Sequence, residues 1–583
     1  MVTWLDWSDE AFASARQRNV PVLLLVRAHW CRWCEDLERR VLADPRVERL
    51  LRERFVCIAV DKDRRPDIDA RYSKGGWPTL AWLDDSGEML VADTYLEVPE
   101  LVRRAEVVSD YYARHKDTIR ARIAAFERER ALEDATAGAG RGGELSLAIV
   151  DHVARTVIET ADPVHGGWGR EHKFPHAEAL DFALIRWSQT GDGEMLQLVV
   201  KTLRGMQEGQ IHDTVEGGFY RYATRADWSA PHHEKVLDGN AQRLHVYLEA
   251  WQVLGDETFL RTARGTIAFL ENVLYDPEAR AFQGSQDADP VYANLRTLDE
   301  RRARGAPRCD GTIFANQNAI AASALLKAAS VLGEPRHAER AHGVLDFLLR
   351  ELHDPARGMY HYYDGGYHLP GLLGDQAYVL RALCDAVQHS GRNAYLKPAR
   401  QIADAAIEQL ASPGGGFFDT AYDPSARGGL RRRDRSILEN SVMAESLLRL
   451  AALSRDPDYA DTAREALASF ASDYKRHGHF TAGYARAVDL LFHEPIRVTV
   501  VGSPNAPDVQ DLVRAAWKPY VASRIVQVID PADDAELLAR SGLPAPRAGE
   551  KARAYVERGR ESYAETAESS RLAALMARVE RGN

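Results

Sequence analysis

The stretch AHWCRWCEDL, residues 28–37, carries two cysteines three positions apart, Cys31 and Cys34. Three interpretations are open: a redox pair, half of a metal site, or two buried thiols in a helix. An apolar run typical of a buried strand, PVLLLV (21–26), precedes the pair. A long amphipathic helix follows it, with an expected interruption near Pro45. The placement of a CxxC between a strand and a helix is the first indication of the fold.

Further strands and helices extend this pattern. FVCIAVD (55–61) reads as a second buried strand, GGWPTLAWLDD (75–85) contains a third and MLVADTYL (89–96) a fourth, and residues 98–114 form a closing helix. The order is strand, CxxC, helix, strand, loop, proline, two strands and helix. This order resembles the thioredoxin fold, and it predicts a thioredoxin-like α/β domain over residues 1–118.

The position of the cysteines gives them distinct expected roles. A cysteine at a helix N-terminus faces unpaired N–H groups and the positive end of the helix dipole, which favour the thiolate. Cys31 is therefore the expected exposed nucleophile and Cys34 the buried resolving thiol, with Arg32 and Trp33 between them. By resemblance to thioredoxin-like proteins, Pro78 is the cis-proline that packs against the disulfide. The alternative is a chance pair in a structural helix.

The composition narrows the class of protein. The net charge is −11 and the calculated pI is near 6.0, which argues against a nucleic-acid groove or a basic membrane face. No apolar run approaches the roughly 18 residues of a membrane span, and MVTWLDWSDEAF is not a secretory signal. Only five cysteines occur, so a reducing cytoplasm is the expected location.

No metal site and no cofactor is expected. A closed zinc site needs four ligands, and no second CxxC, CxxH or HxxxH follows the cysteine pair. Cys57 lies within an apolar strand and is expected in the core.

Between residues 145 and 495 the periodicity changes to helical. We expect twelve helices, over residues 145–160, 177–190, 194–208, 236–254, 257–274, 314–332, 335–352, 374–389, 393–411, 436–454, 457–475 and 482–493. A glycine–aromatic turn recurs after alternate helices, with its aromatics spaced by 51 to 78 residues: Trp168, Phe219, Phe282, Tyr360, Phe417 and Phe480. One helical hairpin per repeat predicts an (α/α)6 barrel of the six-hairpin glycosidase type. An open solenoid is the alternative.

In such a barrel the long loops gather at one mouth and line a pocket. Aromatic, acidic, amide and basic side chains suit a sugar-sized polar ligand, because they offer stacking faces and paired hydrogen bonds. The candidate pocket residues are Trp168, Lys173, Tyr222, His232, Glu234, Lys235, Asn240, Gln242, Asp287, Asp289, Asp375 and Asn440.

Some of these candidates have specific chemical expectations. His232 and Glu234 can act as general acid and base, and Asp287 with Asp289 can form a glycosidase carboxylate pair. The structural alternatives are a helix-start acid for Glu234 and an Asx-turn for the two aspartates.

Two further segments complete the predicted organisation. Residues 119–144 form a helical linker, and residues 496–583 form a small α/β unit. That unit contains strands at 496–502, 524–530 and 552–557 and helices at 507–517, 534–541 and from about 565. The predicted fold class is thus multidomain and mainly α.

The assembled motifs resemble the thioredoxin-domain family that includes spermatogenesis-associated protein 20. They are CRWC, VDKDRRPDID and GGWP in the first domain, then DPVHGGWG with KFP, GGFYRY with PHHEK and DGNAQ, QDAD, GGFFDT and ENSVMAESLLRLA. This resemblance implies a thioredoxin-like domain before an (α/α)6 barrel similar to that of N-acylglucosamine 2-epimerases.

The chain departs from the family pattern at three places. Arg32 and Glu35 stand where the family usually has histidines, and His233 stands where an aromatic is usual, so His232, Glu234 and Lys235 are the matching positions. AYVERGRESY lacks the cysteines that the family often carries near its C-terminus.

Three functions remain as hypotheses. The first is a cytoplasmic thiol–disulfide oxidoreductase fused to a carbohydrate-binding or carbohydrate-processing barrel, with a thiol or disulfide partner protein or a small thiol as its redox partner. The second makes the barrel an isomerase, epimerase or glycoside hydrolase, with the first domain as redox regulator. The third is a non-enzymatic, redox-sensing scaffold. No nucleic acid and no membrane is expected as a partner.

Overall fold

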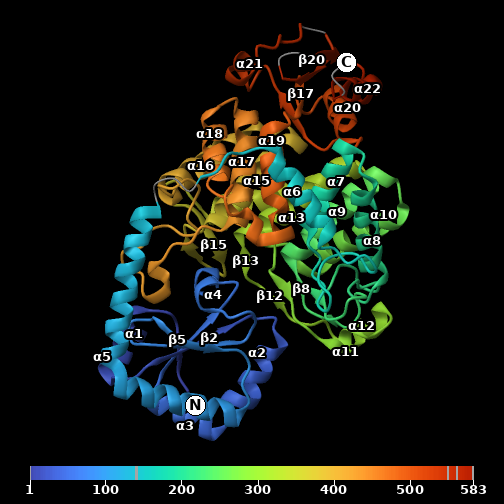
Figure 1. The fold of residues 1–583 in the computed structure, drawn as a ribbon. Helices are drawn as coiled ribbons and strands as arrows, with labels where there is room; N and C mark the ends of the chain where they lie inside the picture. Colours follow the sequence, from blue (N-terminus) through green and yellow to red (C-terminus); the bar gives the residue numbers. More distant parts are fainter. Residues whose placement is uncertain (1, 138–141, 548–549, 560–561, 581–583) are drawn as a thin grey trace. The chain divides into compact units, whose positions relative to one another are not determined.

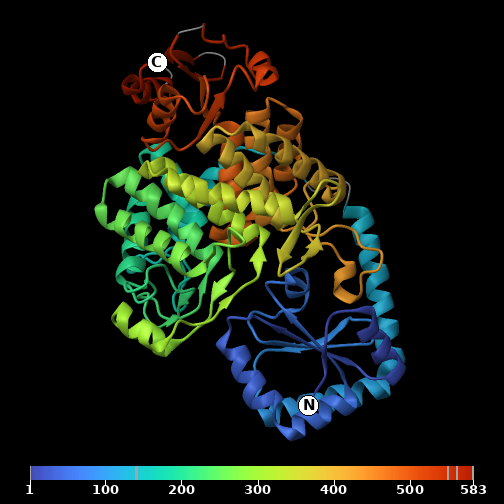
Figure 2. The same cartoon turned by 180° about the vertical axis from the view of Figure 1, so that it is seen from behind.

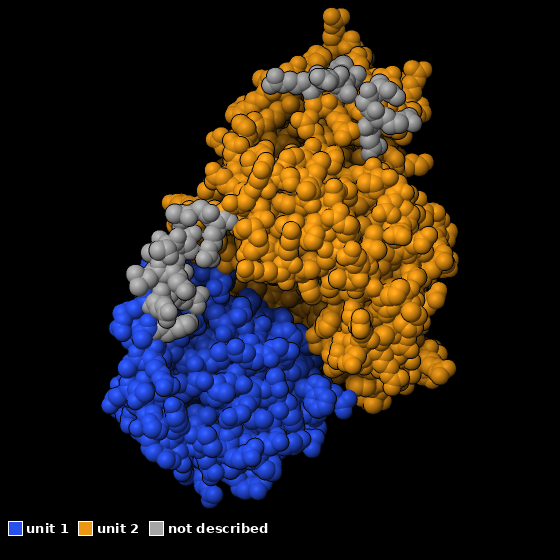
Figure 3. Space-filling view, viewed as in Figure 1, with its two compact units in different colours: residues 1–140, 419–434 blue, residues 141–418, 435–583 orange. Residues whose placement is uncertain are grey.

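A computed structural model describes residues 2–137, 142–547, 550–559 and 562–580. Backbone contacts divide the chain into two compact units. The first contains residues 1–140 together with 419–434, and the second contains residues 141–418 and 435–583, as coloured in Figure 3. No helix of the described residues is long and apolar enough to cross a membrane.

The first unit is built on a five-stranded sheet of order β1-β3-β2-β4-β5. Strands β1, β3 and β2 are parallel, and β4 and β5 are antiparallel to their neighbours. Their bounds are β1 (Trp4–Leu5), β2 (Val22–Arg27), β3 (Val56–Asp61), β4 (Thr79–Leu83) and β5 (Met89–Asp93). The short edge strand β1 was not among the predicted strands.

Helices cover both faces of this sheet (Figure 1). Side chains alternate along the central strand β2, so that Leu24 faces one layer and Leu23 the other. Leu24 packs in the cluster that includes α1 (Asp9–Arg18) and α4 (Pro66–Tyr72). Leu23 packs in the cluster that includes η1 (Leu37–Leu42), α3 (Pro45–Arg54) and α5 (Val98–Ala137). This three-layer arrangement confirms the thioredoxin-like fold, and α3 begins at Pro45, where the helix was expected to be interrupted.

The closing helix α5 is much longer than the predicted 98–114. It continues to Ala137 and has non-helical backbone angles at His115. The predicted linker, residues 119–144, therefore begins inside this helix, and its residues 138–141 lie outside the described part of the chain.

Residues 419–434 join the first unit from far along the sequence. The Tyr72 hydroxyl donates to the carbonyl of Gly87 and accepts from the N–H of Gly429, both at 2.7 Å. Arg71 pairs with Asp419 at 2.8 Å. Gly428 has a φ of +52°, and a Cβ added there would lie 2.1 Å from the Gly87 carbonyl oxygen, so the close approach requires glycine. The expected barrel range, 145–495, had included this segment.

In the second unit, six helices form a closed inner ring. Each contacts the next in chain order, and the last contacts the first. They are α7 (Ala177–Thr190), α9 (Leu237–Leu254), α13 (Ala315–Leu332), α15 (Leu373–Ser390), α17 (Ile437–Ser454) and α19 (Ala482–Phe492). Because the ring closes, this part of the chain is a barrel and not an open solenoid.

Six helices pack outside the ring, one before each inner helix (Figure 2). They are α6 (Leu147–Glu159), α8 (Gly193–Glu208), α10 (Glu257–Phe269), α14 (Pro335–Glu351), α16 (Leu396–Leu410) and α18 (Asp458–Ala468). The six hairpins confirm the predicted (α/α)6 architecture.

Short strands and helices occupy the loops that connect the hairpins. Pairs form between β6 (Tyr222–Ala223) and β7 (Pro231–His232), between β9 (Tyr275–Asp276) and β10 (Ala281–Phe282), among β8 (Lys235–Val236), β11 (Ser285–Gln286) and β12 (Cys309–Asp310), and among β13 (Ile313–Phe314), β14 (His353–Asp354), β15 (Gly358–Tyr363) and β16 (Tyr367–Pro370). The helical segments are α11 (Pro290–Ala293), α12 (Leu298–Arg304), η2 (Leu270–Leu274), η3 (Asn393–Tyr395) and η5 (Tyr474–Thr481), with η4 (Gly428–Arg431) in the first unit.

A side-chain amide fixes the glycine–aromatic turn in four of the hairpins. Asn440, in the first turn of α17, accepts from the N–H of Phe417 at 2.7 Å and donates to the carbonyls of Phe417 and Ser436, both at 2.9 Å. Asn240, Asn318 and Gln376 bind the corresponding turns in the same way, at Phe219, Phe282 and Met359. The repeat in the sequence thus reflects a repeated hydrogen-bonded link between a turn and the inner helix that follows it.

The last part of the second unit is a small α/β fold with a sheet of order β18-β17-β19-β20. Its strands are β17 (Ile496–Val501), β18 (Arg524–Ile529), β19 (Arg553–Arg558) and β20 (Ser562–Thr566), and its helices are α20 (Pro507–Trp517), α21 (Ala535–Ser541) and α22 (Ser569–Glu580). The last helix begins at Ser569, and not near residue 565, because β20 occupies that position.

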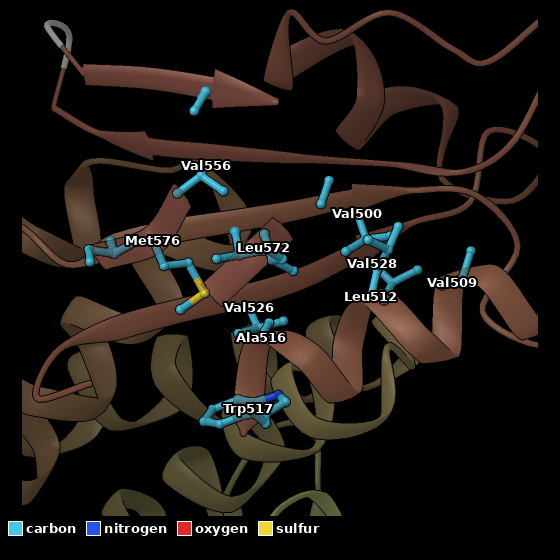
Figure 4. Packing of buried hydrophobic residues seen from close by; sticks show 14 of the residues in the cluster. Val500, Val509, Leu512, Ala516, Trp517, Val526, Val528, Val556, Leu572 and Met576 are labelled. Carbon is cyan, nitrogen blue, oxygen red and sulfur yellow. The ribbon is translucent and has the colours of Figure 1, made fainter. Parts of the chain in front are cut away.

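Valines of β17, β18 and β19 form the core of this fold with α20 and α22 (Figure 4). Trp517, at the end of α20, links it to the barrel. Its indole stacks on His389 with ring centres 3.8 Å apart, and its Nε1 donates to the carbonyl of Gln388 at 3.3 Å. Gln388 and His389 lie in the last turn of α15. The C-terminal fold therefore covers the barrel at the C-terminal end of this inner helix.

Replacing the amide link should destabilise the barrel. Asn440→Ala removes three buried hydrogen bonds and leaves the Phe417 N–H without a partner, so we expect a loss of about 3 kcal/mol in the free energy of unfolding. Denaturant unfolding followed by circular dichroism measures this loss, and hydrogen–deuterium exchange should speed up at residues 412–418. Asn294→Ala, which removes one exposed bond to Pro290, is the matched control and should cost about 0.5 kcal/mol or less. Equal losses in the two variants would contradict the link.

Candidate functional site

The cysteine pair lies at the start of a helix, as its sequence position predicts. Cys31 is the N-cap of α2 (Arg32–Asp36), and its sulfur accepts from the N–H of Cys34 at 3.4 Å. The Cys31 Sγ also lies 3.7 Å from the carbonyl oxygen of Trp77, and the Trp77–Pro78 peptide bond is cis. The thiolate at Cys31 therefore faces the N–H groups of the first turn, which stabilise negative charge.

The two thiols differ in protonation. The hydrogen bond to Cys31, then burial, then the negative charge of Cys31 raise the pKa of Cys34. Of this pair, Cys34 thus keeps its proton at neutral pH. Cys31 is 9% exposed and Cys34 3%, so the expected nucleophile is less exposed than its sequence position suggested.

Aromatic rings frame the pair. Trp30 and Trp77 pack edge to face at 5.9 Å between ring centres, and the Lys62 ammonium lies 4.8 Å from the Trp77 ring centre. Trp33, between the cysteines, is 53% exposed and packs edge-on against Tyr95. An exposed indole beside a reactive sulfur offers a contact surface to a polypeptide that carries a disulfide.

The other three cysteines are also free thiols. Burial raises the pKa of Cys57 to about 12 and that of Cys309 to about 11, and it also raises the pKa of Cys384. Raised pKa values make these thiols poor nucleophiles at neutral pH.

Two lysines among the barrel candidates hold turns together. The buried Lys173 ammonium binds Asp162 and the Gly166 carbonyl, both at 2.7 Å. Lys235 binds Asp213 at 2.6 Å and the Gly217 carbonyl at 2.9 Å. Each lysine thus binds a carboxylate and a backbone carbonyl of its own turn, and the two lysines have equivalent structural roles.

The acidic and amide candidates also have local partners. Asp289 caps the N-terminus of α11 and binds Arg304, while Asp287 binds Arg308. Asp375 is buried against His361, with Nδ1 2.9 Å from Oδ2. Asp289 therefore matches the alternative of a turn or cap residue, whereas Asp287 forms an ion pair with Arg308. Asn240 and Asn440 form the amide links of the fold.

Three other candidates lie together near the start of α7. The rings of His232 and Tyr222 stack with centres 4.5 Å apart, and Tyr222 and Phe174 stack with centres 4.4 Å apart. We define the aromatic row as His232, Tyr222 and Phe174. Glu234 lies next to this row and accepts a hydrogen bond from Arg221 at 2.5 Å. His232 Nδ1 is 3.8 Å from Glu234 Oε1. Trp168 is buried beside Phe174, with which it forms a backbone bridge, and its Nε1 donates to the Val157 carbonyl.

Among the barrel candidates only Gln242 lines a chamber in the centre of the described helical ring. The charged side chains of the larger chamber next to it were missed by the sequence analysis: Asp181, His245, Glu249, Lys327, Arg381, Asp385, Glu445, Arg449, Arg486, Asp489 and Arg524. A signal was present, because polar residues recur four positions apart on otherwise apolar helices, as at His245 and Glu249 or at Arg381 and Asp385.

Thiol labelling should separate the cysteines. At about pH 8, iodoacetamide should modify Cys31 first, because the pKa values of the other four thiols are all raised. Mass spectrometry of tryptic peptides after increasing times gives the order. Faster labelling of Cys34 or Cys57 than of Cys31 would refute this assignment, and denatured protein, in which all five react, is the control.

Comparison with known proteins gives matches for both parts of the chain. Residues 1–130 match the family model Thioredox_DsbH, described as a protein of unknown function, DUF255. A shorter stretch is 38% identical to the thiol:disulfide interchange protein DsbD 1 of Pseudomonas aeruginosa, over 14% of each chain. Among solved structures, a sugar epimerase from a ruminal bacterium aligns with a TM-score of 0.48 and 13% identity over 59% of this chain and 98% of its own.

One similarity extends over nearly the whole chain. Spermatogenesis-associated protein 20 of Homo sapiens is 25% identical over 92% of this chain and 85% of its own length, and the Rattus norvegicus protein is 25% identical over 92% and 84%. With the match of residues 1–130 to Thioredox_DsbH, these alignments confirm the resemblance of the chain to the thioredoxin-domain family that includes spermatogenesis-associated protein 20.

Proposed function

We propose that the first unit is a thiol–disulfide oxidoreductase whose reacting groups are Cys31 and Cys34. The observation that carries this proposal is the asymmetric thiol pair: Cys31 at the N-cap of α2, and Cys34 one turn later with a pKa raised by its hydrogen bond to Cys31. A structural pair of buried thiols has no need of such an asymmetry, whereas disulfide exchange requires one thiolate and one waiting thiol.

The reaction takes two exchange steps. The Cys31 thiolate attacks one sulfur of a substrate disulfide, which forms a mixed disulfide and releases the other substrate sulfur as a thiolate. Cys34 then loses its proton to solvent and attacks the Cys31 sulfur, which forms the Cys31–Cys34 disulfide and releases the second substrate thiolate. The substrate gains two electrons and the protein loses two, so a thiol reductant of the cytoplasm must restore the pair.

The order of the steps follows from the electrostatics of the pair. While Cys31 is a thiolate, its hydrogen bond and its charge hold the proton on Cys34. Once Cys31 is bound in the mixed disulfide, its negative charge is gone and burial is the main remaining cause of the raised pKa. The Cys34 thiolate is therefore favoured at the stage at which the second attack needs it.

The partner in this proposal is a protein disulfide or a small disulfide. The exposed indole of Trp33, which lies between the two cysteines in the sequence, favours a polypeptide, because it offers an uncovered apolar face. Arg32 adds a positive charge next to the reacting sulfur, which favours acidic segments around the substrate disulfide.

Cysteine variants test the reaction. Cys31→Ser should abolish reduction of insulin disulfides by the dithiothreitol-coupled protein, and Cys34→Ser should accumulate the mixed disulfide, because no resolving thiol remains. Turbidity measures the first effect and mass spectrometry the second. Cys57→Ser is the matched control and should keep full activity, since its thiol is buried in the core. Reduction of insulin disulfides by the Cys31→Ser variant would refute the proposal.

A carbohydrate ligand of the barrel is the second candidate function. The observation that favours it is the aromatic row of His232, Tyr222 and Phe174, in which Phe174 is 40% exposed and Tyr222 and His232 are half-buried. Aromatic faces of this kind support stacking of sugar rings, and the charged groups Arg221 and Glu234 beneath the row supply hydrogen bonds.

Substitution at the exposed end of the row tests this function. Phe174→Ala should weaken binding of a saccharide identified by screening mono- and disaccharides, by about 0.5–1.5 kcal/mol, because one stacking face is lost. Phe492→Ala is the matched control, since Phe492 is also 40% exposed but lies at the end of α19. Titration calorimetry gives the affinities, and equal affinities for wild type and Phe174→Ala would count against the row.

A further inference from the structure

The centre of the helical ring is a polar chamber and not an apolar core. It has a volume of about 110 Å³, enough for several water molecules or a small ligand. Residues from all six inner helices line it, and residues 521–525 with Trp517 close one end. A second space of about 50 Å³ shares Asp181, His245, Ser323, Arg381 and Arg486 with it. This space extends the chamber toward Glu178, at the start of α7.

The carboxylates of the chamber already have cationic partners. Asp181 and Glu445 bind Arg486, and Glu445 also binds Arg449 at 2.7 Å. Arg449 in turn binds Asp385 at 3.0 Å, and Lys327 binds Glu249 at 2.5 Å. In this network the three carboxylates of Asp181, Glu445 and Asp385 share the two guanidinium groups of Arg486 and Arg449. The charge of Arg381 also helps to lower the pKa of Glu445.

Arg381 differs from Arg449 and Arg486 in its contacts. Its Nε is buried without a hydrogen-bond partner, and its guanidinium makes no ion pair among the described residues. It lines both parts of the chamber and is half-buried. A guanidinium presents a planar set of donors that matches a carboxylate or phosphate, so Arg381, whose Nε has no acceptor, can bind an anion in the chamber.

Glu249 supplies a second unsatisfied group. Its Oε1 accepts from Lys327, and its Oε2 is buried without a donor, since the residue is only 6% exposed. The Glu249 carboxylate lies close enough to Asp181 to accept a hydrogen bond when Asp181 is protonated. His245 Nε2 lies 3.3 Å from Glu249 Oε1, and ligand atoms of Asp181, His245 and Glu249 lie within 4.8 Å of one another. A free carboxylate oxygen in such a place accepts a hydrogen bond from a hydroxyl of a bound molecule.

The two carboxyl groups differ in protonation. Burial and then the charge of Glu249 raise the pKa of Asp181 to about 6. Burial opposes ionisation of Glu249, but the charges of Lys327 and His245 hold its pKa well below the usual range. Asp181 can therefore take up a proton as the pH falls toward 6, whereas Glu249 stays ionised.

We propose that the barrel chamber binds a small hydroxyl-bearing anion, whose carboxylate or phosphate group pairs with Arg381 and whose hydroxyls face Glu249, His245 and Asp181. A metal ion is a poorer occupant of the same three side chains, because the ammonium of Lys327 and the guanidinium of Arg486 already bind the two carboxylates. The site is distinct from the aromatic row and does not depend on the reaction of Cys31 and Cys34.

Ligand-induced thermal stabilisation of the full-length protein tests the proposal. The probes are gluconate and glucose 6-phosphate, which carry an anion and hydroxyls, with glucose and inorganic phosphate as the two partial probes. We expect a saturable rise of a few degrees in the melting temperature with one of the first two, and none with glucose. If inorganic phosphate stabilises as strongly as both of them, the requirement for hydroxyls is wrong.

Arg381→Met is the decisive variant. Affinity for the stabilising probe should fall at least about tenfold, while the melting temperature without ligand should stay unchanged or rise, since the variant removes an unpaired charge. Arg464→Gln, an exposed arginine on α18, is the matched control and should bind as the wild type does. A purely structural role of Arg381 would lower the melting temperature of the free protein instead.

Three results would overturn the proposal: no anion of the panel binds, glucose binds as well as gluconate, or Arg381→Met binds unchanged. If Arg381→Met does not fold, Arg381→Lys decides, because it keeps the charge but removes the planar set of donors. Weaker binding of the probe by Arg381→Lys supports the guanidinium as the anion's partner, and unchanged binding contradicts it.

Discussion

The hydrogen-bonded link between a side-chain amide and the preceding turn is the interaction on which the barrel depends. At Asn240, Asn318, Gln376 and Asn440 the amide satisfies both the N–H and the carbonyl of one turn residue. Each link joins the outer helix of a hairpin to the start of its inner helix. It leaves the inward face of the inner helices free to carry polar groups, because the ring does not rely on an apolar centre for its closure.

This freedom explains the unusual interior of the ring. Buried charges cost free energy unless each is paired, and here a chain of arginines and carboxylates extends from Asp181 through Arg486, Glu445 and Arg449 to Asp385. Such a network is seldom the most stable solution for a core. The unpaired guanidinium of Arg381 is costlier still, and an anionic ligand supplies a reason to retain it.

In the first unit, groups close together in the sequence set the electrostatic environment of Cys31 and Cys34. A single helix turn places Cys34 next to Cys31, so the Cys34 N–H donates to the Cys31 sulfur, and a side-chain hydrogen bond between the two cysteines raises the pKa of Cys34. The surrounding sheet only has to fix the start of α2 beside the Trp77 carbonyl. For this reason the short motif CRWC predicts most of that site, whereas no short motif predicts the barrel chamber.

The sequence by itself determined the features that depend on near neighbours in the chain. Continuous apolar runs place the strands around CRWC, and helical periodicity places all twelve barrel helices, since a helix that buries one face requires that spacing. The glycine–aromatic turns indicate six hairpins, because one such turn recurs after alternate helices. The closing strand β20 and the full length of α5 were missed, because neither the short half-exposed strand nor the polar continuation of the helix has an apolar pattern of its own.

Only the tertiary structure decided which polar residues share a site. Lys173, Lys235, Asp287 and Asp289 look like ligand-binding residues in the sequence, yet each is occupied by a turn or an arginine nearby. Arg381 and Glu249 look like ordinary charges of a helix, yet ring closure brings them to one chamber. Residues 419–434 join the first unit across more than 300 positions of sequence, as the Arg71–Asp419 pair shows. Contacts between distant segments follow from the closure of the fold, and no local pattern encodes them.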